Sequence, residues 1–349
     1  MNILIIKLSS IGDVIHTLPS LASLRKRFAD AHISWVVEEG ISNIIENHPY
    51  LNEVIVFKKG LFKKTISNPL KYPYLIAEVA QFVRKLGERQ YDIVIDYQGL
   101  LKSGIISFLS RGKRRIGFDK TRELSYLFLN ERVPQCAPNI HATEKYRKLT
   151  MHITEEQDST EFLISIKESD TAHIVEMLSE GNTSTYEPYV VMNPGTKWKS
   201  KMWPDDKYVS LAHMIKHQLH YNIVFSGGMS DRETIENITQ RLDFPIKNIA
   251  GKTTLRQAAS LFKMAKAAIT PDTGPMHIAA AVGTPVVALF GPTSPSRTGP
   301  HGKKHVIIGG KSPCSPCFNR DCTDMTCMEN ITVDEVFHAL VTCCTRTDD

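Results

Sequence analysis

The chain has 349 residues, of which 42% are hydrophobic and 23% charged, and its formal net charge at pH 7 is +5. This size and composition predict a soluble globular protein of two domains, each with its own core. The small surplus of positive charge and the lack of nucleic-acid-binding motifs argue against a nucleic-acid partner. The apolar runs are too short to span a bilayer, and the N-terminus is a poor match to a signal peptide, so we expect a cytoplasmic protein.

The first half of the chain alternates short apolar runs with helix-compatible segments. Strands are predicted at residues 2–6, 32–37, 54–57, 91–96 and 116–118, with an amphipathic helix at 73–86. The turn after the first strand, residues 7–13 (KLSSIGD), is rich in small residues and leads into another helix. Ligands gather at the carboxyl ends of strands in open α/β sheets, so this turn is a candidate site with Asp13 as its acidic group. Capping of the helix start is the alternative role for Asp13.

Two basic stretches also belong to the first half. One carries two lysine pairs around Leu61 and Phe62, and the other spans residues 111–115 (RGKRR). A short run of charge is most often a solvated face. The alternative is a patch that attracts an acidic acceptor at a membrane surface.

The second half repeats the alternation of strands and helices. Strands are predicted at 189–192, 222–225, 247–250, 267–270 and 286–290. The segment 154–185 is polar and weakly patterned, and we place the crossing between domains there, with domains at 1–170 and 171–349. The last helix is expected either in the second domain or packed back on the first. The predicted fold class is α/β, with two parallel-sheet domains facing across a cleft.

The stretch 271–277 (PDTGPMH) lies between a predicted strand and a predicted helix. Asp272 or Thr273 can cap this helix, and Pro275 fits its first turn. Free backbone N–H groups and the helix dipole favour an anion there, and His277 can add a hydrogen bond or a positive charge. These residues fit a site for the diphosphate of a nucleotide-linked donor. They fit an ordinary capped helix with a surface histidine equally well.

Seven segments in order along nearly the whole chain resemble the lipopolysaccharide heptosyltransferases of glycosyltransferase family 9. The segments are 7–13 (KLSSIGD), 35–40 (WVVEEG), 96–103 (DYQGLLKS), 141–144 (HATE), 201–204 (KMWP), 272–274 (DTG) with His277, and 290–293 (FGPT). The second and third are most similar to type I enzymes, heptosyltransferase I. No single segment is decisive, but their number and order make the resemblance specific.

The resemblance implies a fold, a reaction and a location. The family has the GT-B architecture of two Rossmann-like domains, the first binding the acceptor and the second ADP-heptose. Type I enzymes invert the anomeric centre, need no metal for catalysis, and transfer L-glycero-D-manno-heptose to the inner Kdo of Kdo2-lipid A. They act in lipopolysaccharide core biosynthesis at the cytoplasmic face of the inner membrane. We therefore expect ADP-heptose, Kdo2-lipid A and an anionic membrane surface as partners.

The resemblance also assigns residues to roles. Asp13 matches the family's general base, which takes the proton of the acceptor hydroxyl. Lys201 matches the lysine that contacts the donor phosphates and stabilises the leaving ADP. Donor binding is further assigned to Thr196, Asp272, Thr273, Gly274 and His277. Glu233 is the choice for the adenosine ribose by analogy with other ribose-binding acids, although a simple charge near a helix start also explains it. Acceptor binding is predicted from the two basic stretches for Lys58, Lys59, Lys63, Lys64 and Arg115, and Ser10 and Gln98 complete the predicted set.

Four cysteines near the C-terminus depart from the type I pattern. They are Cys314, Cys317, Cys322 and Cys327, and their spacing is C-x2-C-x4-C-x4-C. Thiolates at such spacings can bind structural zinc or iron, but reduced thiols or a labile disulfide are alternatives. A similar cysteine pair occurs in other branches of the family, so a related specificity stays open.

Other classes of function fit parts of the same pattern. A sugar-nucleotide epimerase could share the architecture, but it would leave the basic stretches unexplained. A non-catalytic nucleotide-binding module would bind ADP-sugar without turnover. A protein heptosyltransferase would share donor and fold but modify a polypeptide.

Overall fold

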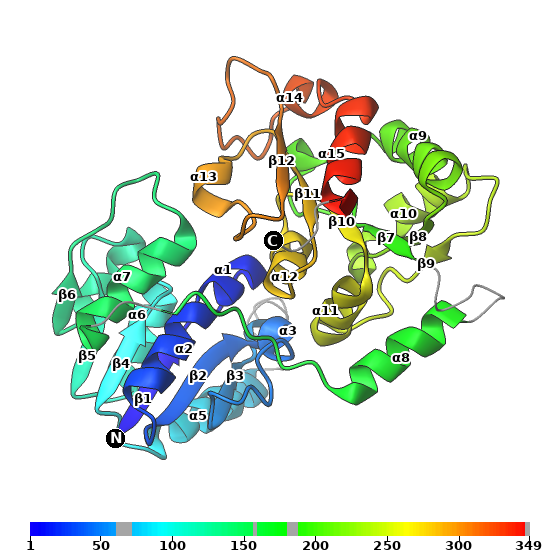
Figure 1. Ribbon diagram of the computed structural model, residues 1–349. Helices are drawn as coiled ribbons and strands as arrows, with labels where there is room; N and C mark the ends of the chain where they lie inside the picture. The colour runs from blue at the N-terminus through cyan, green and yellow to red at the C-terminus, as the bar shows by residue number, and fades with distance from the viewer. Residues whose placement is uncertain (61–71, 156–158, 180–187, 346–349) are drawn as a thin grey trace. The chain divides into compact units, whose positions relative to one another are not determined.

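The computed structural model describes residues 1–60, 72–155, 159–179 and 188–345, and it divides into two compact units (Figure 1). Unit 1 is Met1–Ser165 and unit 2 is Ile166–Asp349. Each unit is built around its own parallel sheet.

The described part of unit 1 contains a six-stranded sheet in the order β3-β2-β1-β4-β5-β6. Its strands are β1 (Asn2–Ile6), β2 (His32–Glu38), β3 (Glu53–Phe57), β4 (Ile93–Asp96), β5 (Arg114–Phe118) and β6 (Glu131–Val133). Its helices are α1 (Ile11–His16), α2 (Leu18–Arg27), α3 (Glu39–Ser42), α5 (Tyr72–Gly87), α6 (Leu101–Leu109), η2 (Arg122–Phe128) and α7 (Ala142–Thr154). All neighbouring strands are parallel.

Unit 2 repeats this plan with a six-stranded sheet, within its described residues, in the order β12-β11-β10-β7-β8-β9. Its strands are β7 (Tyr189–Met192), β8 (Asn222–Phe225), β9 (Lys247–Asn248), β10 (Ala267–Pro271), β11 (Val286–Phe290) and β12 (Val306–Gly309). Its helices are α8 (Glu168–Ser179), η3 (Lys199–Lys201), α9 (Asp205–Met214), η4 (Ile215–Leu219), η5 (Met229–Asp231), α10 (Arg232–Thr239), α11 (Leu255–Met264), α12 (Gly274–Ala281), α13 (Pro295–Thr298), α14 (Thr326–Glu329) and α15 (Val333–Thr345). The last helix, α15, packs on the sheet of its own unit.

The central strands are apolar on both faces because helices cover both sides of each sheet. In β1, Ile3, Leu4, Ile5 and Ile6 are completely buried, and all five residues of β11 are buried as well. Burial of one such aliphatic side chain stabilises the fold by about 1.5–3 kcal/mol. The continuous apolar runs in the sequence therefore mark the sheet centres.

The strand order of each sheet predicts where a ligand can bind within that unit. The chain starts each sheet in the middle, moves to one edge, and then returns to continue on the other side of the first strand. The connections after β1 and β4, and likewise those after β7 and β10, therefore diverge at a topological switch point, where ligands bind in such sheets.

The predicted fold class of two Rossmann-like parallel-sheet domains is confirmed. The sequence did not predict β6 or β12, which are short edge strands and only partly buried. Helix α12 begins at Gly274 with Thr273 as its N-cap residue and Pro275 in its first turn, as predicted. Helix α8 lies inside the segment judged weakly patterned.

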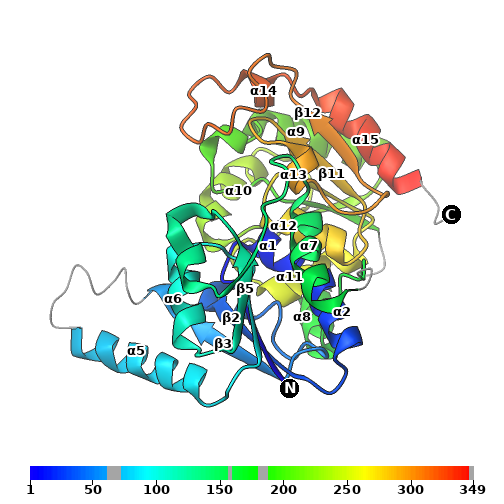
Figure 2. The same ribbon diagram turned by 90° about the vertical axis from the view of Figure 1, so that its left-hand side faces the viewer.

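Helix α5 stands at the margin of unit 1 beside β3 (Figure 2). Among the described residues of this helix only Leu86 is fully buried. No helix in the described ranges is both long and apolar enough to cross a membrane.

Candidate functional site

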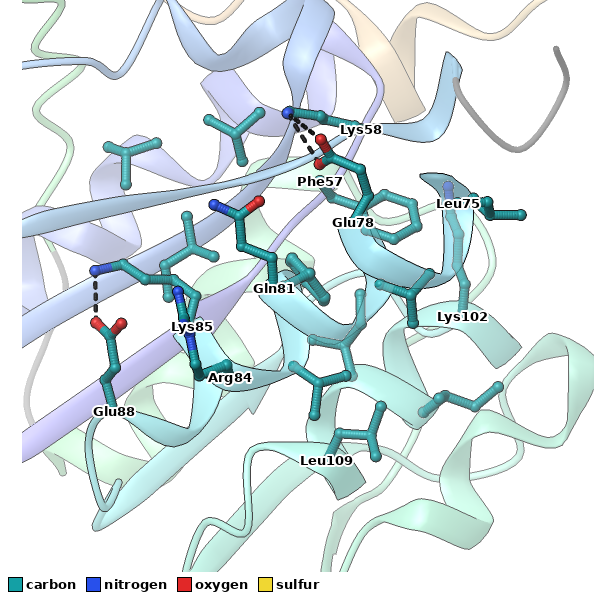
Figure 3. A pocket seen from close by; sticks show the side chains of 18 residues that line it. Phe57, Lys58, Leu75, Glu78, Gln81, Arg84, Lys85, Glu88, Lys102 and Leu109 are labelled. Carbon is teal, nitrogen blue, oxygen red and sulfur yellow. Dashed lines mark hydrogen bonds and ion pairs between the residues drawn. The ribbon is translucent and has the colours of Figure 1, made fainter. Parts of the chain in front are cut away.

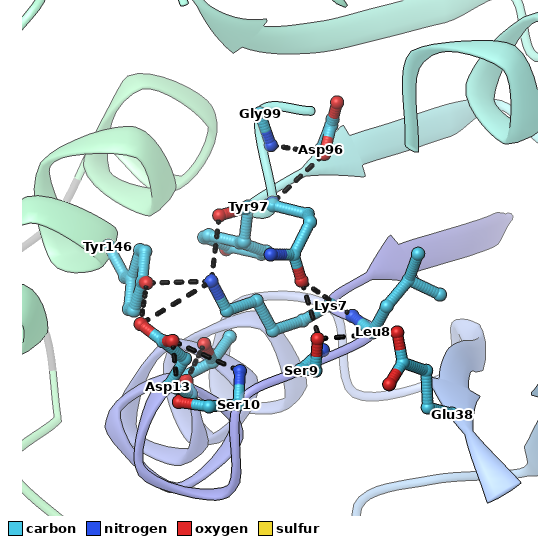
Figure 4. Close-up of polar contacts among 12 residues, drawn as sticks. Lys7, Leu8, Ser9, Ser10, Asp13, Glu38, Asp96, Tyr97, Gly99 and Tyr146 are labelled. Carbon is cyan, nitrogen blue, oxygen red and sulfur yellow. Dashed lines mark hydrogen bonds and ion pairs between the residues drawn. The ribbon is translucent and has the colours of Figure 1, made fainter. Parts of the chain in front are cut away.

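The turn after β1 places Asp13 at the centre of a hydrogen-bonded cluster (Figure 4). The carboxylate of Asp13 accepts hydrogen bonds from the backbone N–H and the hydroxyl of Ser10, at 3.0 and 2.9 Å. Its other oxygen accepts a hydrogen bond from the hydroxyl of Tyr146 at 2.6 Å. About a third of the Asp13 side chain, 35%, stays exposed. The carboxylate is therefore held in one orientation but remains open to a ligand.

Lys7 and Tyr146 form the buried side of this cluster. The ammonium of Lys7 lies 3.6 Å from the Asp13 carboxylate and donates hydrogen bonds to the Tyr146 hydroxyl at 2.7 Å and to the carbonyl oxygen of Tyr97 at 3.2 Å. Lys7 is only 2% exposed and Tyr146 only 5%. Tyr146 lies on α7, so the cluster brings together residues from near the start and near the end of unit 1.

The charges of this cluster fix the protonation states. Partial burial opposes ionisation of Asp13, but the Lys7 ammonium and the hydrogen bonds from Tyr146 and Ser10 outweigh it, and the pKa of Asp13 lies well below its ordinary value. Burial lowers the pKa of Lys7, although attraction by Asp13 and Asp96 opposes the change. Burial and the nearby Asp13 carboxylate raise the pKa of Tyr146, so its hydroxyl stays a donor. Asp13 is therefore ionised at neutral pH.

The turn after β4 supports the turn after β1 across the switch point. The side-chain oxygen of Gln98 accepts hydrogen bonds from the backbone N–H groups of Leu8 and Ser9, both at 3.0 Å. Asp96 is 2% exposed, and burial raises the pKa of its carboxyl, which accepts hydrogen bonds from Gly99, Gln98 and Ser103. Gln98 thus positions the turn that carries Asp13; its predicted contact with the acceptor stays a prediction.

Glu38 connects this turn to the basic residues of unit 1. Its carboxylate lies 2.6 Å from the Lys102 ammonium and 3.4 Å from that of Lys59, and it accepts a hydrogen bond from Ser9 at 3.3 Å. Lys58 is instead paired with Glu78 at 2.9 Å. The other predicted acceptor lysines, Lys63 and Lys64, lie outside the described residues.

Arg115 is engaged within unit 1. Its guanidinium donates hydrogen bonds to the carbonyl oxygens of Phe128 at 2.9 Å and Gly112 at 3.0 Å. These bonds give Arg115 a structural role, and its role in acceptor binding stays a prediction.

In unit 2 the structure brings Lys201 and Asp272 together. The Lys201 ammonium donates hydrogen bonds to the Asp272 carboxylate at 2.7 Å and to the carbonyl oxygen of Asp272 at 3.1 Å. Both side chains are largely buried, with 13% and 7% exposed. The ammonium also lies 4.3 Å from the centre of the Trp198 ring. Lys201 is thus held at the carboxyl end of β10.

Helix α12 begins two residues after Asp272. Thr273 is its extended N-cap residue, Gly274 is its first residue, and His277 is buried within the first turn. The first N–H groups of a helix have no partner within it and carry partial positive charge. Together with Lys201 they make this end of unit 2 suited to a diphosphate.

The turns after β7 and β8 approach each other closely around an aspartate that the sequence did not single out. The carboxylate of Asp231 accepts a hydrogen bond from the N–H of Gly228 at 2.7 Å, and a side chain at position 195 would force this carboxylate to shift. Thr196 follows this glycine and is half-buried, whereas Glu233 is exposed in the first turn of α10.

Two further polar atoms lie at the same edge of the sheet. Within the part of the chain that the structure describes, Asn193 Oδ1 and Thr293 Oγ1 are buried without a hydrogen-bond partner. Asn193 follows β7 and Thr293 follows β11, on either side of β10. Buried polar groups are normally paired, so these atoms favour a ligand at this edge.

The cysteine array does not form a ligand set in this structure. Cys314 and Cys317 are exposed, Cys322 donates a hydrogen bond to the carbonyl oxygen of Asp324 at 2.9 Å, and Cys327 is buried. Burial, together with the neighbouring cysteines, raises the pKa of Cys327. Across the described ranges no three His, Cys, Asp or Glu side chains are placed to hold a metal ion together. Structural zinc or iron at this array stays a prediction.

The sequence indicated which segments carry the candidate site, but not which side chains contact the predicted residues. Lys7, Glu38 and Lys102 lie inside segments that carry the resemblance, but a short segment does not show which side chains meet. Tyr146 lies just after the segment 141–144, and its link to Asp13 spans 133 residues.

Comparison with known proteins places these sites in a family context. The family model described as glycosyltransferase family 9 (heptosyltransferase) matches residues 79–327. The protein named lipopolysaccharide heptosyltransferase 1 from Pseudomonas aeruginosa is 32% identical over 329 residues, which cover 93% of this chain and 88% of that protein.

Solved structures give the same result for the fold. The structure of the Escherichia coli heptosyltransferase WaaC with ADP is 26% identical, has a TM-score of 0.76, and is matched over 98% of this chain and all of that one. A family 9 glycosyltransferase from Veillonella parvula has a TM-score of 0.85 at 22% identity, over 98% of this chain and 97% of that one. The architecture is therefore the GT-B arrangement expected from the sequence.

Proposed function

Because the chain belongs to glycosyltransferase family 9 (heptosyltransferase), we propose that it transfers L-glycero-D-manno-heptose from ADP-heptose to the inner Kdo of Kdo2-lipid A with inversion. The Asp13 cluster carries this proposal, because it offers one oriented, ionised carboxylate in unit 1. The similarity to lipopolysaccharide heptosyltransferases 1 over 93% of the chain supports the choice of donor and acceptor class.

Asp13 acts as the general base in this proposal. The acceptor oxygen attacks the anomeric carbon, the bond from that carbon to the ADP oxygen breaks, and the electron pair leaves with ADP. The hydroxyl proton becomes acidic as the new bond forms, and it passes to Asp13. A lowered pKa makes Asp13 a weak base in the resting protein, but it ensures that the carboxylate is ionised when the acceptor arrives.

Unit 2 binds the donor in this proposal. Lys201 and the N-terminus of α12 stabilise the diphosphate, whose negative charge increases as ADP leaves. Thr273, Gly274 and Thr196 supply hydrogen bonds to its oxygens, with His277 beside them. Asp272, oriented by Lys201, binds hydroxyls of the heptose, and Glu233 binds the adenosine ribose. Residues of the chain thus supply the charge neutralisation, and the catalytic step is proposed without a metal.

Unit 1 binds the acceptor in this proposal. Kdo2-lipid A presents carboxylates and phosphates at a membrane surface, and Lys58 and Lys59 lie on the same unit as Asp13. We place the enzyme in the cytoplasm, peripherally bound to the inner face of the inner membrane. Ser10, Gln98 and Arg115 complete the proposed acceptor set, together with Lys63 and Lys64.

One assay separates this function from its alternatives. Purified protein is incubated with ADP-heptose alone, with Kdo2-lipid A, and with a polypeptide acceptor, and ADP release and heptosylated product are measured. We expect ADP release that depends on Kdo2-lipid A. Transfer to the polypeptide would indicate a protein heptosyltransferase instead. Isomerisation of the donor alone would indicate an epimerase, and binding without turnover would indicate a binding module.

A structural metal at the cysteine array, outside the reaction, stays a proposal, and its binding would have to bring together thiols that do not form a ligand set in this structure. Metal analysis of protein purified under reducing conditions should show about one zinc or iron ion per chain. Protein that is folded and contains neither metal would overturn this assignment.

A further inference from the structure

Helix α5 leaves part of its apolar side uncovered. Tyr72 is 45% exposed, Ile76 is 67% exposed and Val79 is 39% exposed, and their spacing of four and three residues places them on one side of the helix. An amphipathic helix of a globular protein normally buries this stripe against its own core. The exposed stripe therefore marks a surface on which a partner can lie.

Beneath this helix lies a cavity of about 490 Å³ between α5, β3 and α6 (Figure 3). Its walls are mostly aliphatic and aromatic, and they include Leu75, Val79, Phe82, Ile105, Ile106 and Leu109. Its volume lies in the range of sites that hold one small ligand. The cavity can therefore hold an apolar chain.

Charged side chains stand around this apolar cavity. Figure 3 shows Lys58 and Glu78 at one end, Arg84, Lys85 and Glu88 at another, and Lys102 on a third side. Three of the four lining cations are paired with acids: Lys58 with Glu78, Lys85 with Glu53 and Glu88, and Lys102 with Glu38. With Lys59 and Arg89, which contact Glu38 and Glu53, the margin holds six cations and four acids among the described residues, so its surplus of positive charge is small. An apolar slot with a cationic margin matches a lipid that has an acyl chain and an anionic headgroup.

The neighbouring helix extends the apolar surface. On α6, Ile105 is 40% exposed and Phe108 is 56% exposed, and η2, which packs against α6, exposes Leu124 and Leu127. The three consecutive helices α5, α6 and η2, which pack pairwise, thus each expose apolar residues, more than scattered single residues would.

We propose that the α5–α6 cavity accepts an acyl chain of an anionic bilayer phospholipid and that this contact anchors unit 1 to the membrane. This proposal rests on the proposed function in one respect: an acceptor in the membrane is the reason why the enzyme would bind there. A single acyl chain gives marginal, reversible binding, and the small surplus of positive charge at the margin adds a weak attraction to anionic headgroups.

Binding to vesicles tests this proposal with a matched pair of variants. Val79 in the cavity wall and Val175 on α8 of unit 2 are both helical valines with 39% exposure. We measure co-sedimentation with vesicles of phosphatidylcholine and phosphatidylglycerol in a 3:1 ratio, without ADP-heptose. Val79→Glu should weaken binding about tenfold or more, whereas Val175→Glu should bind as the wild type does. Thermal melting of both variants verifies that they are folded.

Insertion of the chain is tested separately. In Val79→Trp, lipids brominated within the acyl chain should quench the added tryptophan emission more strongly than lipids labelled at the headgroup. Equal quenching, or wild-type binding by Val79→Glu, would overturn the proposal. Self-association that Val79→Glu abolishes would also overturn it, because a second copy would then occupy the surface. Since no transfer is measured, a failed transferase assay leaves this result interpretable.

Discussion

The proposed chemistry of unit 1 depends on one side chain, that of Asp13. Asp13→Ala should lower turnover by about 100-fold to 10,000-fold while ADP-heptose binds almost normally, because a base is needed only when the acceptor attacks. Single-turnover kinetics and calorimetry with ADP measure the two quantities. Asp30→Ala, at an exposed aspartate of the same unit, is the control. Weaker donor binding with unchanged turnover of the bound donor would refute the assignment.

Lys7 keeps Asp13 ionised, and kcat/KM should therefore depend on pH differently with and without Lys7. Since the pKa of Asp13 lies below its ordinary value, the wild type should show no loss of kcat/KM from this group between about pH 7 and pH 5. In Lys7→Met the pKa of Asp13 rises, so activity should fall at a higher pH on the acidic side. Lys148→Met, an exposed lysine on α7, should leave the profile unchanged. Identical acidic limbs in Lys7→Met and wild type would contradict the role of Lys7.

Lys201 serves both the fold and the proposed reaction. Lys201→Ala should weaken ADP binding and lower the maximal rate by about 100-fold, because the diphosphate gains charge in the transition state. It should also destabilise unit 2 by about 3 kcal/mol, since Asp272 is left buried without its partner. Steady-state kinetics and thermal melting measure these effects, with Lys199→Ala as the exposed neighbouring control. An unchanged rate at saturating donor would leave Lys201 a structural residue only.

At the scale of elements, the sequence predicted what depends on local pattern. The buried central strands β1 and β11 are predicted directly by their apolar runs, and the turns that follow strands are predicted by small residues. The edge strand β6 (ERV) lacks such a run, and the run in β12 (VIIG) is only three residues long; both strands are partly solvated. Which turns meet is set by strand order, and the sequence alone does not give the pairing of β1 with β4.

The same limit applies to the candidate site. Asp13 and Lys201 could be predicted because each lies in a turn after a strand that also carries the family resemblance. Tyr146 could not be assigned, because its contact with Asp13 depends on how α7 packs. The Asp231 carboxylate beside Gly195 likewise depends on two turns that are distant in sequence. Such partners follow from tertiary structure rather than from local pattern.

At the scale of the whole molecule, attraction to an acidic acceptor should depend on salt. Changing Lys58, Lys59, Lys63 and Lys64 to glutamine should raise the KM for Kdo2-lipid A and leave ADP-heptose binding unchanged. Each cation near an anionic surface contributes about 1 kcal/mol, and Lys58 and Lys59 contribute less because each is paired with a glutamate.

The difference from wild type should shrink as salt is raised, since the wild type loses the same attraction. Acceptor kinetics at low and high ionic strength measure this change. The control replaces four exposed lysines of unit 2, Lys252, Lys263, Lys266 and Lys303. Wild-type acceptor kinetics for the unit 1 variant at both salts would show that these lysines form a solvated face.

The central claim is inverting heptosyl transfer to the inner Kdo, and the structure of the product tests it most directly. The protein is incubated with ADP-L-glycero-β-D-manno-heptose and Kdo2-lipid A, and the purified product is analysed by mass spectrometry and NMR. The account predicts one added heptose, α-linked to the inner Kdo. A β-linked heptose, a heptose at another position, or unmodified acceptor with active donor present would contradict it.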